Sequence, residues 1–317
     1  GSELAVSATA YEITASPNRF PSNMSDYDFR EFAHNVAIAL DIDEDKVYRQ
    51  ASNTSSAYTI IARQAEKDAV ERLRQYMSSD DYINNKYTGV LHIGETQKRY
   101  YPHGNLLSTV LGFVGTDNQG LEGLELKYES YLAGVDGKRI AAQSLDGSTL
   151  PFEYQKEIPA ENGSNIYLTI DLKLQYILEK YIYETRVEHN VQNRVAGIII
   201  DVKTGEILAM ATKPDYDPNE PFTIIDEMVL SSLASEYGYG TDEYVTAYNA
   251  KAKELWRNKL CEQYEPGSTF KILTAAMALE EGKVSLYETF NCYGWLDISR
   301  VRIHCNKRDG HGDEDLR

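Results

Sequence analysis

The stretch Glu265-Pro266-Gly267-Ser268-Thr269-Phe270-Lys271 is the most informative part of this chain. Its Pro-Gly pair ends the structure before it, and residues 270–281 are then apolar on nearly every side until Gly282. A helix that is apolar all round is a buried one, so this pattern predicts a buried helix. Ser268 and Lys271 are three residues apart and therefore lie on one face of its first turn.

This spacing of a hydroxyl and an amine indicates an activated serine. Burying a lysine is costly unless it is paired or neutral, and a neutral Lys271 would be a general base for the Ser268 hydroxyl. The free N–H groups at the start of the helix would stabilise an oxyanion. The alternative is an N-cap serine followed by a solvated lysine, because Ser-x-x-Lys is common by chance. The Pro-Gly lead-in and the apolar helix favour the catalytic interpretation.

The region before this stretch predicts a sheet with helices on its faces. Residues 165–169 predict a strand, and Asp171 can cap a helix. Two apolar runs, 195–200 and 206–211, are joined by a Gly-containing turn and predict a hairpin at the centre of a sheet. Residues 215–248 are acidic and turn-rich, and the acidic patches of 215–243 indicate a solvated, mobile flap rather than a metal site. The helix after Asp171 is expected to bury an apolar face made of Leu172, Leu174, Ile177, Leu178, Tyr181 and Ile182.

The first part of the chain predicts two helices packed on a small sheet. Strand patterns lie at residues 4–15 and 58–62, and amphipathic helical patterns lie at 26–40 and 66–77. Residues 88–137 are rich in glycine but carry no nucleotide-binding motif, which predicts a loop-rich subdomain with one short helix at 121–132.

The polar stretch 151–163 is the best candidate for an interdomain boundary. It predicts an N-terminal domain of residues 1–160 and a second domain of residues 161–317.

Composition excludes several classes of protein. The chain has 317 residues with 49 acidic and 32 basic side chains, a net charge of −17, and so lacks the basic surface of a nucleic-acid binder. Its 42% hydrophobic content is ordinary for a globular protein and argues against disorder. Neither a membrane-spanning run nor a signal peptide is visible. Three cysteines do not make a disulfide framework.

The heptad 265–271 resembles the first active-site motif of the class B penicillin-binding proteins, the monofunctional peptidoglycan transpeptidases of division and sporulation. This resemblance implies an α/β (α+β) transpeptidase domain of the penicillin-binding-protein and serine β-lactamase type, preceded by an elongated α+β pedestal. It extends over nearly the whole chain, because further stretches resemble other parts of the family in the expected order: 4–7, 99–102, 120–134, 168–175 and 201–211.

The resemblance also implies a reaction. Ser268 would be acylated by the penultimate D-Ala carbonyl of a peptidoglycan stem peptide, and the terminal D-Ala would leave. Lys271 would accept the serine proton and later help to activate the amine of a neighbouring stem. β-Lactams would acylate Ser268 as substrate mimics, and no cofactor is required for catalysis.

Two motifs of the family are missing from their expected place. Its Ser-x-Asn and Lys-Thr-Gly motifs follow the first motif, whereas Ser16-Pro17-Asn18 and Lys203-Thr204-Gly205 precede Ser268. We therefore interpret both matches as turns. We expect the transpeptidase domain to be truncated, and a family-type N-terminal membrane anchor to be absent from this chain. The resemblance places the protein at the extracytoplasmic face of the bacterial membrane.

Cys292, Cys305 and His311 form a second constellation, with Asp297, His304 and Asp313 close by in the sequence. Thiolates with an imidazole suit Zn²⁺, so a structural zinc site is one interpretation. A Cys292–Cys305 disulfide and two unpaired buried thiols are the alternatives. Some Gram-positive members of the family look similar here, and the pattern indicates a clostridial-type source.

Two other functions remain open at this point. One is a serine β-lactamase or β-lactam sensor, which shares Ser-x-x-Lys but has no pedestal. The other is a non-catalytic scaffold of a division or sporulation complex. The expected partners are peptidoglycan stem peptides, the lipid-linked precursor, β-lactams, and glycosyltransferase, divisome or spore-cortex proteins, with no nucleic acid.

Overall fold

The structure is a computed structural model that describes residues 1–141 and 155–316. It contains two compact units, Gly1–Cys261 and Glu262–Arg317, and each is described by itself. No helix among the described residues is long and apolar enough to cross a membrane.

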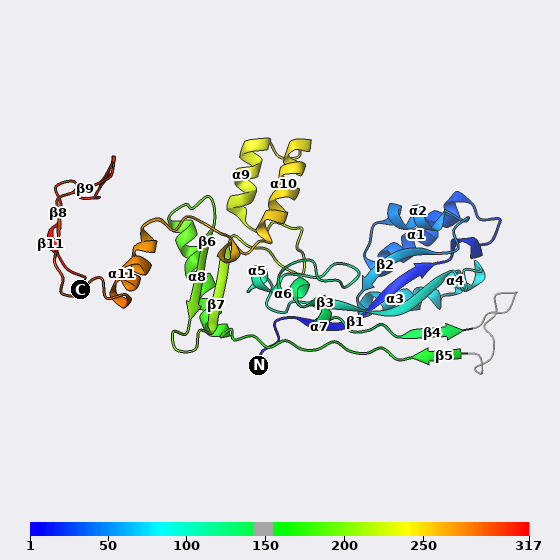
Figure 1. The fold of residues 1–317 in the computed structure, drawn as a ribbon. Coiled ribbons are helices and arrows are strands. Elements are labelled where there is room, and N and C mark those ends of the chain that lie inside the picture. The colour runs from blue at the N-terminus through cyan, green and yellow to red at the C-terminus, as the bar shows by residue number, and fades with distance from the viewer. Residues whose placement is uncertain (142–154, 317) are drawn as a thin grey trace. The chain divides into compact units, whose positions relative to one another are not determined.

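The first unit begins with a three-stranded antiparallel sheet in the order β2-β1-β3 (Figure 1). Its strands are β1 (Val6–Ala15), β2 (Thr59–Ala65) and β3 (Leu91–Tyr100). Four helices accompany it: α1 (Asp26–Leu40), α2 (Glu44–Ala51), α3 (Lys67–Met77) and α4 (Asp80–Asn84). The two strands and two helices expected in this part of the chain are thus confirmed.

Local chemistry fixes the ends of α1. Ser25 Oγ accepts a hydrogen bond from the Asp28 N–H, and the Asp28 carboxylate accepts one from the Ser25 N–H at 2.7 Å, which completes a capping box. The helix ends at Asp41, which is left-handed with φ 55°. Between these ends, side chains at helical spacing enter the core, where the rings of Phe20 and Phe32 meet edge to face with centroids 4.9 Å apart.

The segment after β3 is built from short elements: α5 (Ser108–Leu111), α6 (Gly123–Lys127) and α7 (Glu129–Leu132). The single helix expected at 121–132 is therefore wrong, because Tyr128 leaves the helical conformation with φ −112° and separates α6 from α7. An antiparallel pair follows, β4 (Lys138–Ala141) and β5 (Gln155–Ile158). Residues 151–154 of the expected boundary lie outside the described residues, and the division at residue 160 stays a prediction.

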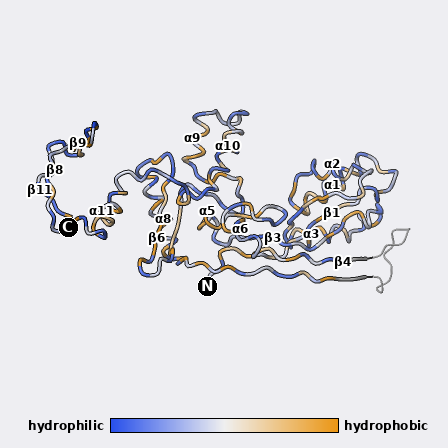
Figure 2. Tube along the Cα trace, in the orientation of Figure 1, coloured by the Kyte–Doolittle hydropathy of each residue, from blue (hydrophilic) through white to orange (hydrophobic). Residues whose placement is uncertain are grey.

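The rest of the first unit consists of α8 (Leu172–Glu188), the hairpin β6 (Val195–Ile200) and β7 (Ile207–Lys213), α9 (Glu227–Tyr237) and α10 (Asp242–Leu255). The hairpin is confirmed as an antiparallel pair, and β6 is hydrophobic along most of its length (Figure 2). In the described residues it forms a two-stranded sheet rather than the centre of a larger one. Residues 215–248 are not a loose flap, because α9 and α10 share a core that includes Leu233 and Leu255.

Of two expectations about the start of this region, one is wrong and the other holds only in part. Residues 165–169 form no strand, since their contact with β7 rests on side-chain and cap bonds such as Thr169 Oγ1 to Ile207 O at 2.7 Å. The expected apolar face of α8 is buried only in part: Ile182 is buried, and Leu172, Leu174 and Leu178 are partly buried. Ile177 and Tyr181 are half exposed, whereas the residues that α8 buries are Gln175, Glu179, Ile182 and Arg186. Polar partners from distant parts of the chain hold that face in place.

The second unit holds α11 (Phe270–Glu280) and two two-stranded antiparallel sheets. These pair β9 (Trp295–Ile298) with β10 (Val301–His304) and β8 (Phe290–Cys292) with β11 (Gly312–Glu314). The prediction that α11 is buried is wrong for this structure, because none of its residues is buried and Ile272 is 74% exposed. The short strands among residues 262–316 offer too little surface to cover a helix on all sides.

Candidate functional site

Ser268 and Lys271 lie on consecutive turns of one continuous helical segment. Gly267, in the left-handed region with φ 57°, opens a 3-10 helix over Gly267–Thr269 that runs directly into α11. Thr269 Oγ1 donates a hydrogen bond to the Pro266 carbonyl at 2.6 Å and stabilises this entry. Ser268 is therefore at the start of the helical segment and Lys271 is in the first turn of α11, as the sequence predicts.

The surroundings of this pair differ from the expected ones. Both side chains are exposed, so the prediction of a buried Lys271 is wrong for this structure. Within the described residues, no hydrogen bond joins Ser268 Oγ to Lys271 Nζ. The apolar residues of α11 that should surround the lysine, such as Phe270 and Leu273, are about half exposed, and without a cover they do not desolvate it.

The two motif matches placed before Ser268 are turns, as predicted. Lys203-Thr204-Gly205 is the turn of the β6–β7 hairpin, where Asp201 Oδ1 accepts a hydrogen bond from the Lys203 N–H at 2.7 Å. Ser16-Pro17-Asn18 follows β1 and contributes to the 3-10 helix Pro17–Arg19.

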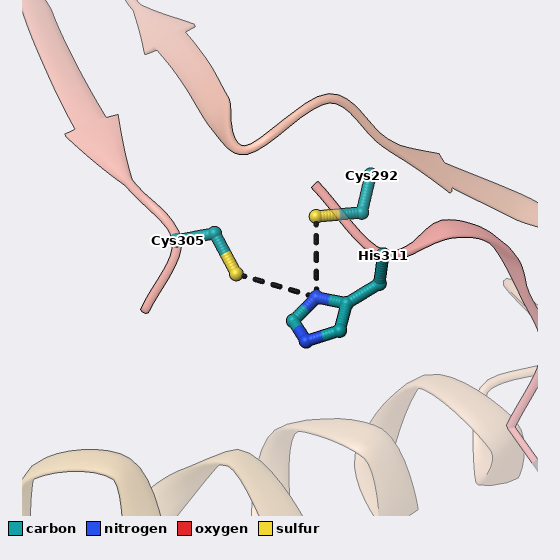
Figure 3. Close-up of side chains that lie close together, drawn as sticks. All are labelled: Cys292, Cys305 and His311. Atoms are coloured by element: carbon teal, nitrogen blue, oxygen red, sulfur yellow. Dashed lines mark hydrogen bonds between the residues drawn. The ribbon is translucent and has the colours of Figure 1, made fainter. Parts of the chain in front are cut away.

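Cys292, Cys305 and His311 come together in the second unit (Figure 3). His311 Nδ1 lies 3.6 Å from Cys292 Sγ and 3.5 Å from Cys305 Sγ, and the three atoms are within 4.8 Å of one another. The neighbouring Asp297 and Asp313 are engaged elsewhere, with Arg302 and Asn291 respectively.

Two glycines allow this close approach. Gly310 has φ 81°, and a Cβ there would lie 2.1 Å from Cys292 O. Gly294 has φ 88°, and a Cβ there would lie 2.0 Å from Arg308 O. Any side chain at either position would force the segment that carries His311 away from the one that carries Cys292.

The electrostatics of the cluster favour a thiolate. The hydrogen bond from His311 lowers the pKa of Cys292 to about 7. Both cluster cysteines are free and half-buried, so the structure does not contain the disulfide considered as an alternative. Tetrahedral zinc with bonds of ~2.3 Å to sulfur and ~2.0–2.1 Å to nitrogen spaces these ligands about 3.6 Å apart. The two sulfur–nitrogen distances match that spacing, so the residues fit a zinc ion.

Sequence patterns missed the buried charges of the first unit. Lys213 forms ion pairs with Glu179 and Asp215, and Arg99 pairs with Glu125. One sequence signal could have indicated the group around Lys213, namely a charged residue at the end of an apolar strand. Lys213 ends β7, and a lysine buried there needs an acidic partner.

Comparison with known families decides what kind of protein this is. Residues 195–316 match the transpeptidase domain of penicillin-binding proteins, and residues 1–168 match their dimerisation domain. The chain belongs to the class B penicillin-binding proteins. This penicillin-binding protein thus has a dimerisation region, the expected pedestal, followed by a transpeptidase region, both of mixed helix and strand.

Among its curated relatives is the stage V sporulation protein D of Bacillus subtilis, 31% identical over 98% of this chain and 42% of that protein. Another is the peptidoglycan D,D-transpeptidase FtsI of Escherichia coli K12, 28% identical over 78% of this chain and 36% of that protein. The chain thus spans about two fifths of the length of these relatives. A Gram-positive, clostridial source stays a prediction.

Solved structures share the fold of this penicillin-binding protein. Penicillin-binding protein 2X of Streptococcus thermophilus matches with a TM-score of 0.57 and 24% identity over 95% of this chain and 42% of that one. PBP2 of Helicobacter pylori, in its complex with MreC, matches with a TM-score of 0.65 and 19% identity over 99% of this chain and 56% of that one.

Proposed function

We propose that this chain is part of a peptidoglycan D,D-transpeptidase whose acyl-enzyme forms on Ser268. The observation that carries the proposal is the geometry of residues 266–271, where a serine at the start of a helical segment is followed one turn later by a lysine. The family supports it, and relatives such as FtsI are named as D,D-transpeptidases.

In the proposed reaction, Ser268 Oγ attacks the penultimate D-Ala carbonyl of a stem peptide while Lys271 Nζ accepts the hydroxyl proton. The peptide C–N bond breaks, the terminal D-Ala leaves with a proton, and an ester to Ser268 remains. The amine of a second stem then attacks this ester and loses a proton to the lysine. The ester C–O bond breaks, Ser268 Oγ leaves and takes back a proton from the lysine, and the new amide is the cross-link. Free N–H groups at the start of the helical segment stabilise the oxyanion in both steps.

This reaction requires an environment that changes the behaviour of Lys271. A fully solvated lysine is mostly protonated at neutral pH and is then no base. Catalysis therefore requires that the apolar residues of α11 be covered in the whole protein, so that the lysine is desolvated.

The test is covalent labelling of the full-length protein with a fluorescent penicillin. We expect the parent to bind one label that stays attached, Ser268→Ala to bind none, and the exposed control Ser285→Ala to bind as the parent does. Rapid turnover of the label would favour a serine β-lactamase or sensor. A parent protein that takes up no label would favour a non-catalytic scaffold.

The substrates and partners follow from the same proposal. Stem peptides and their lipid-linked precursor lie outside the cytoplasmic membrane, so we infer that the protein acts there, held by an N-terminal anchor. A related PBP2 was solved as a complex with MreC, which supports a partner protein of the cell-wall machinery for this chain as well.

We also propose that Cys292, Cys305 and His311 hold a structural Zn²⁺, with the fourth ligand not assigned. The support is the pair of sulfur–nitrogen distances and the lowered pKa of Cys292. Metal analysis of the purified protein should find one zinc per chain, lost in Cys305→Ser and kept in Cys261→Ser, since Cys261 is exposed and outside the cluster. Zinc-free protein with readily alkylated cysteines would refute the site.

A further inference from the structure

A buried lysine in the first unit is shared by two buried carboxylates. Lys213 Nζ lies 2.8 Å from Glu179 Oε2 and 2.6 Å from Asp215 Oδ2. All three residues are less than 10% exposed. Lys213 ends β7, Glu179 is in the middle of α8, and Asp215 follows β7, so this charge cluster joins the helix to the hairpin.

Each carboxylate of the cluster also holds the loop that follows β3. The Leu107 N–H donates to Glu179 Oε1 at 2.8 Å. Asn105 Nδ2 lies 3.2 Å from both oxygens of Asp215. Leu107 and Asn105 belong to the region that matches the dimerisation domain, whereas Lys213 and Asp215 belong to the region that matches the transpeptidase domain.

Further hydrogen bonds join the segment after β3 to the segment after β7. Asn219 uses its side-chain amide like a backbone group, accepting from the Tyr101 N–H and donating to the Tyr101 carbonyl, both at 3.0 Å. The Tyr216 hydroxyl donates to the Ser108 carbonyl at 3.0 Å. Residues 101–108 and 213–219 are therefore joined through side chains rather than a strand ladder, and Tyr101, Leu107 and Tyr216 also share one apolar cluster.

The lysine is the counter-ion that both carboxylates of the cluster share. Two carboxylates and one ammonium are buried together, and removal of the ammonium would leave two like charges without a counter-ion in a poorly solvated place. Burial by itself would lower the pKa of Lys213, but Asp215 and Glu179 outweigh burial and raise it, so the lysine stays charged. Its positive charge keeps both carboxylates within reach of residues 105–107.

We propose that Lys213, with Glu179 and Asp215, is a latch through which the loop 101–108 of the dimerisation region sets the position of α8 and the end of β7. This positioning role is separate from the chemistry at Ser268. Because the latch contacts both the loop 101–108 and the α8–β7 region, a change in either part alters the other part, as reciprocal coupling requires.

Hydrogen exchange followed by mass spectrometry on the full-length protein tests the latch. Lys213→Met should speed exchange of peptides from residues 101–111 at least about tenfold, because two buried charges lose their partner. Peptides from β1 should exchange as in the parent. The matched control is Lys180→Met, which removes an exposed lysine of α8 whose ion pair is with the exposed Glu184.

The reverse experiment perturbs the dimerisation region and measures hydrogen exchange in α8 and β7. Asn105→Ala removes the amide that bonds Asp215, and we expect peptides from α8 and β7 to exchange about fivefold faster. Unchanged exchange there in Asn105→Ala, or equal acceleration of all peptides including β1, would overturn the proposal. If Lys213→Met does not fold, Asn105→Ala alone decides the question, and neither readout depends on penicillin binding.

Discussion

Arg99 and Glu125 form an ion pair in which Arg99 Nε lies 2.9 Å from Glu125 Oε1, and the side chain of Glu125 is 6% exposed. The Tyr101 hydroxyl approaches the same oxygen at 3.4 Å. The pair joins two stretches that carry the family resemblance, residues 99–102 and 120–134. Those stretches are thus two sides of one buried contact in the dimerisation region.

Replacement of Arg99 should destabilise the first unit strongly. Arg99→Met leaves the Glu125 carboxylate buried without a counter-ion, at a cost of about 3 kcal/mol in the free energy of unfolding. The control is Arg63→Met, which breaks an exposed pair with Asp117 and should cost less than about 1 kcal/mol. Urea denaturation measures both, and equal losses would contradict the role of burial.

Two glycines with similar positive φ angles should respond differently to alanine. Gly112 has φ 75° and Gly205 has φ 78°, but a Cβ at Gly112 would lie 1.8 Å from Glu122 O, whereas nothing lies within 4 Å at Gly205. Gly205→Ala should cost about 1–2 kcal/mol of backbone strain. Gly112→Ala should cost more than about 4 kcal/mol, because backbone must move. Similar urea midpoints for the two variants would refute the close approach at Gly112.

Asp215 should make stability depend on pH. Burial raises its pKa from 3.8 to about 6, although Lys213 opposes the shift. The folded chain therefore binds this proton more tightly than the unfolded one, and the resulting stabilisation is full below about pH 4 and is lost as pH rises through about 6. Between pH 4 and pH 7, the free energy of unfolding of Asp215→Asn should rise by on the order of 2 kcal/mol relative to that of the parent. Denaturation curves at several pH values measure this difference, and a constant difference would contradict it.

Lys271 should control the rate of acylation. In the full-length protein, Lys271→Ala removes the proposed general base, so the second-order rate of penicillin labelling should fall about 10²–10⁴-fold. Lys283→Ala, a lysine just beyond α11, should label at the parental rate. Stopped-flow labelling measures both rates. Parental acylation by Lys271→Ala would assign the base to another group.

Sequence by itself determined the elements whose signals are local. Helix α1 was predicted with the bounds it has, since its apolar residues at helical spacing are a signal that acts within a few positions. The β6–β7 hairpin was predicted because two apolar runs flank a turn that Gly205 permits. The spacing of Cys292, Cys305 and His311 was enough to suggest the cluster that the structure brings together.

Only the tertiary structure decided which face of α8 is buried. By composition, Ile177 and Tyr181 belong inside, but Gln175 is the residue with no exposure, because its amide pairs with both backbone groups of Met210. Polar side chains can be buried when each finds a partner, and these partners lie more than 30 positions away. Sequence periodicity records the polarity of a residue, whereas the location of its partner is set by how the chain folds back on itself.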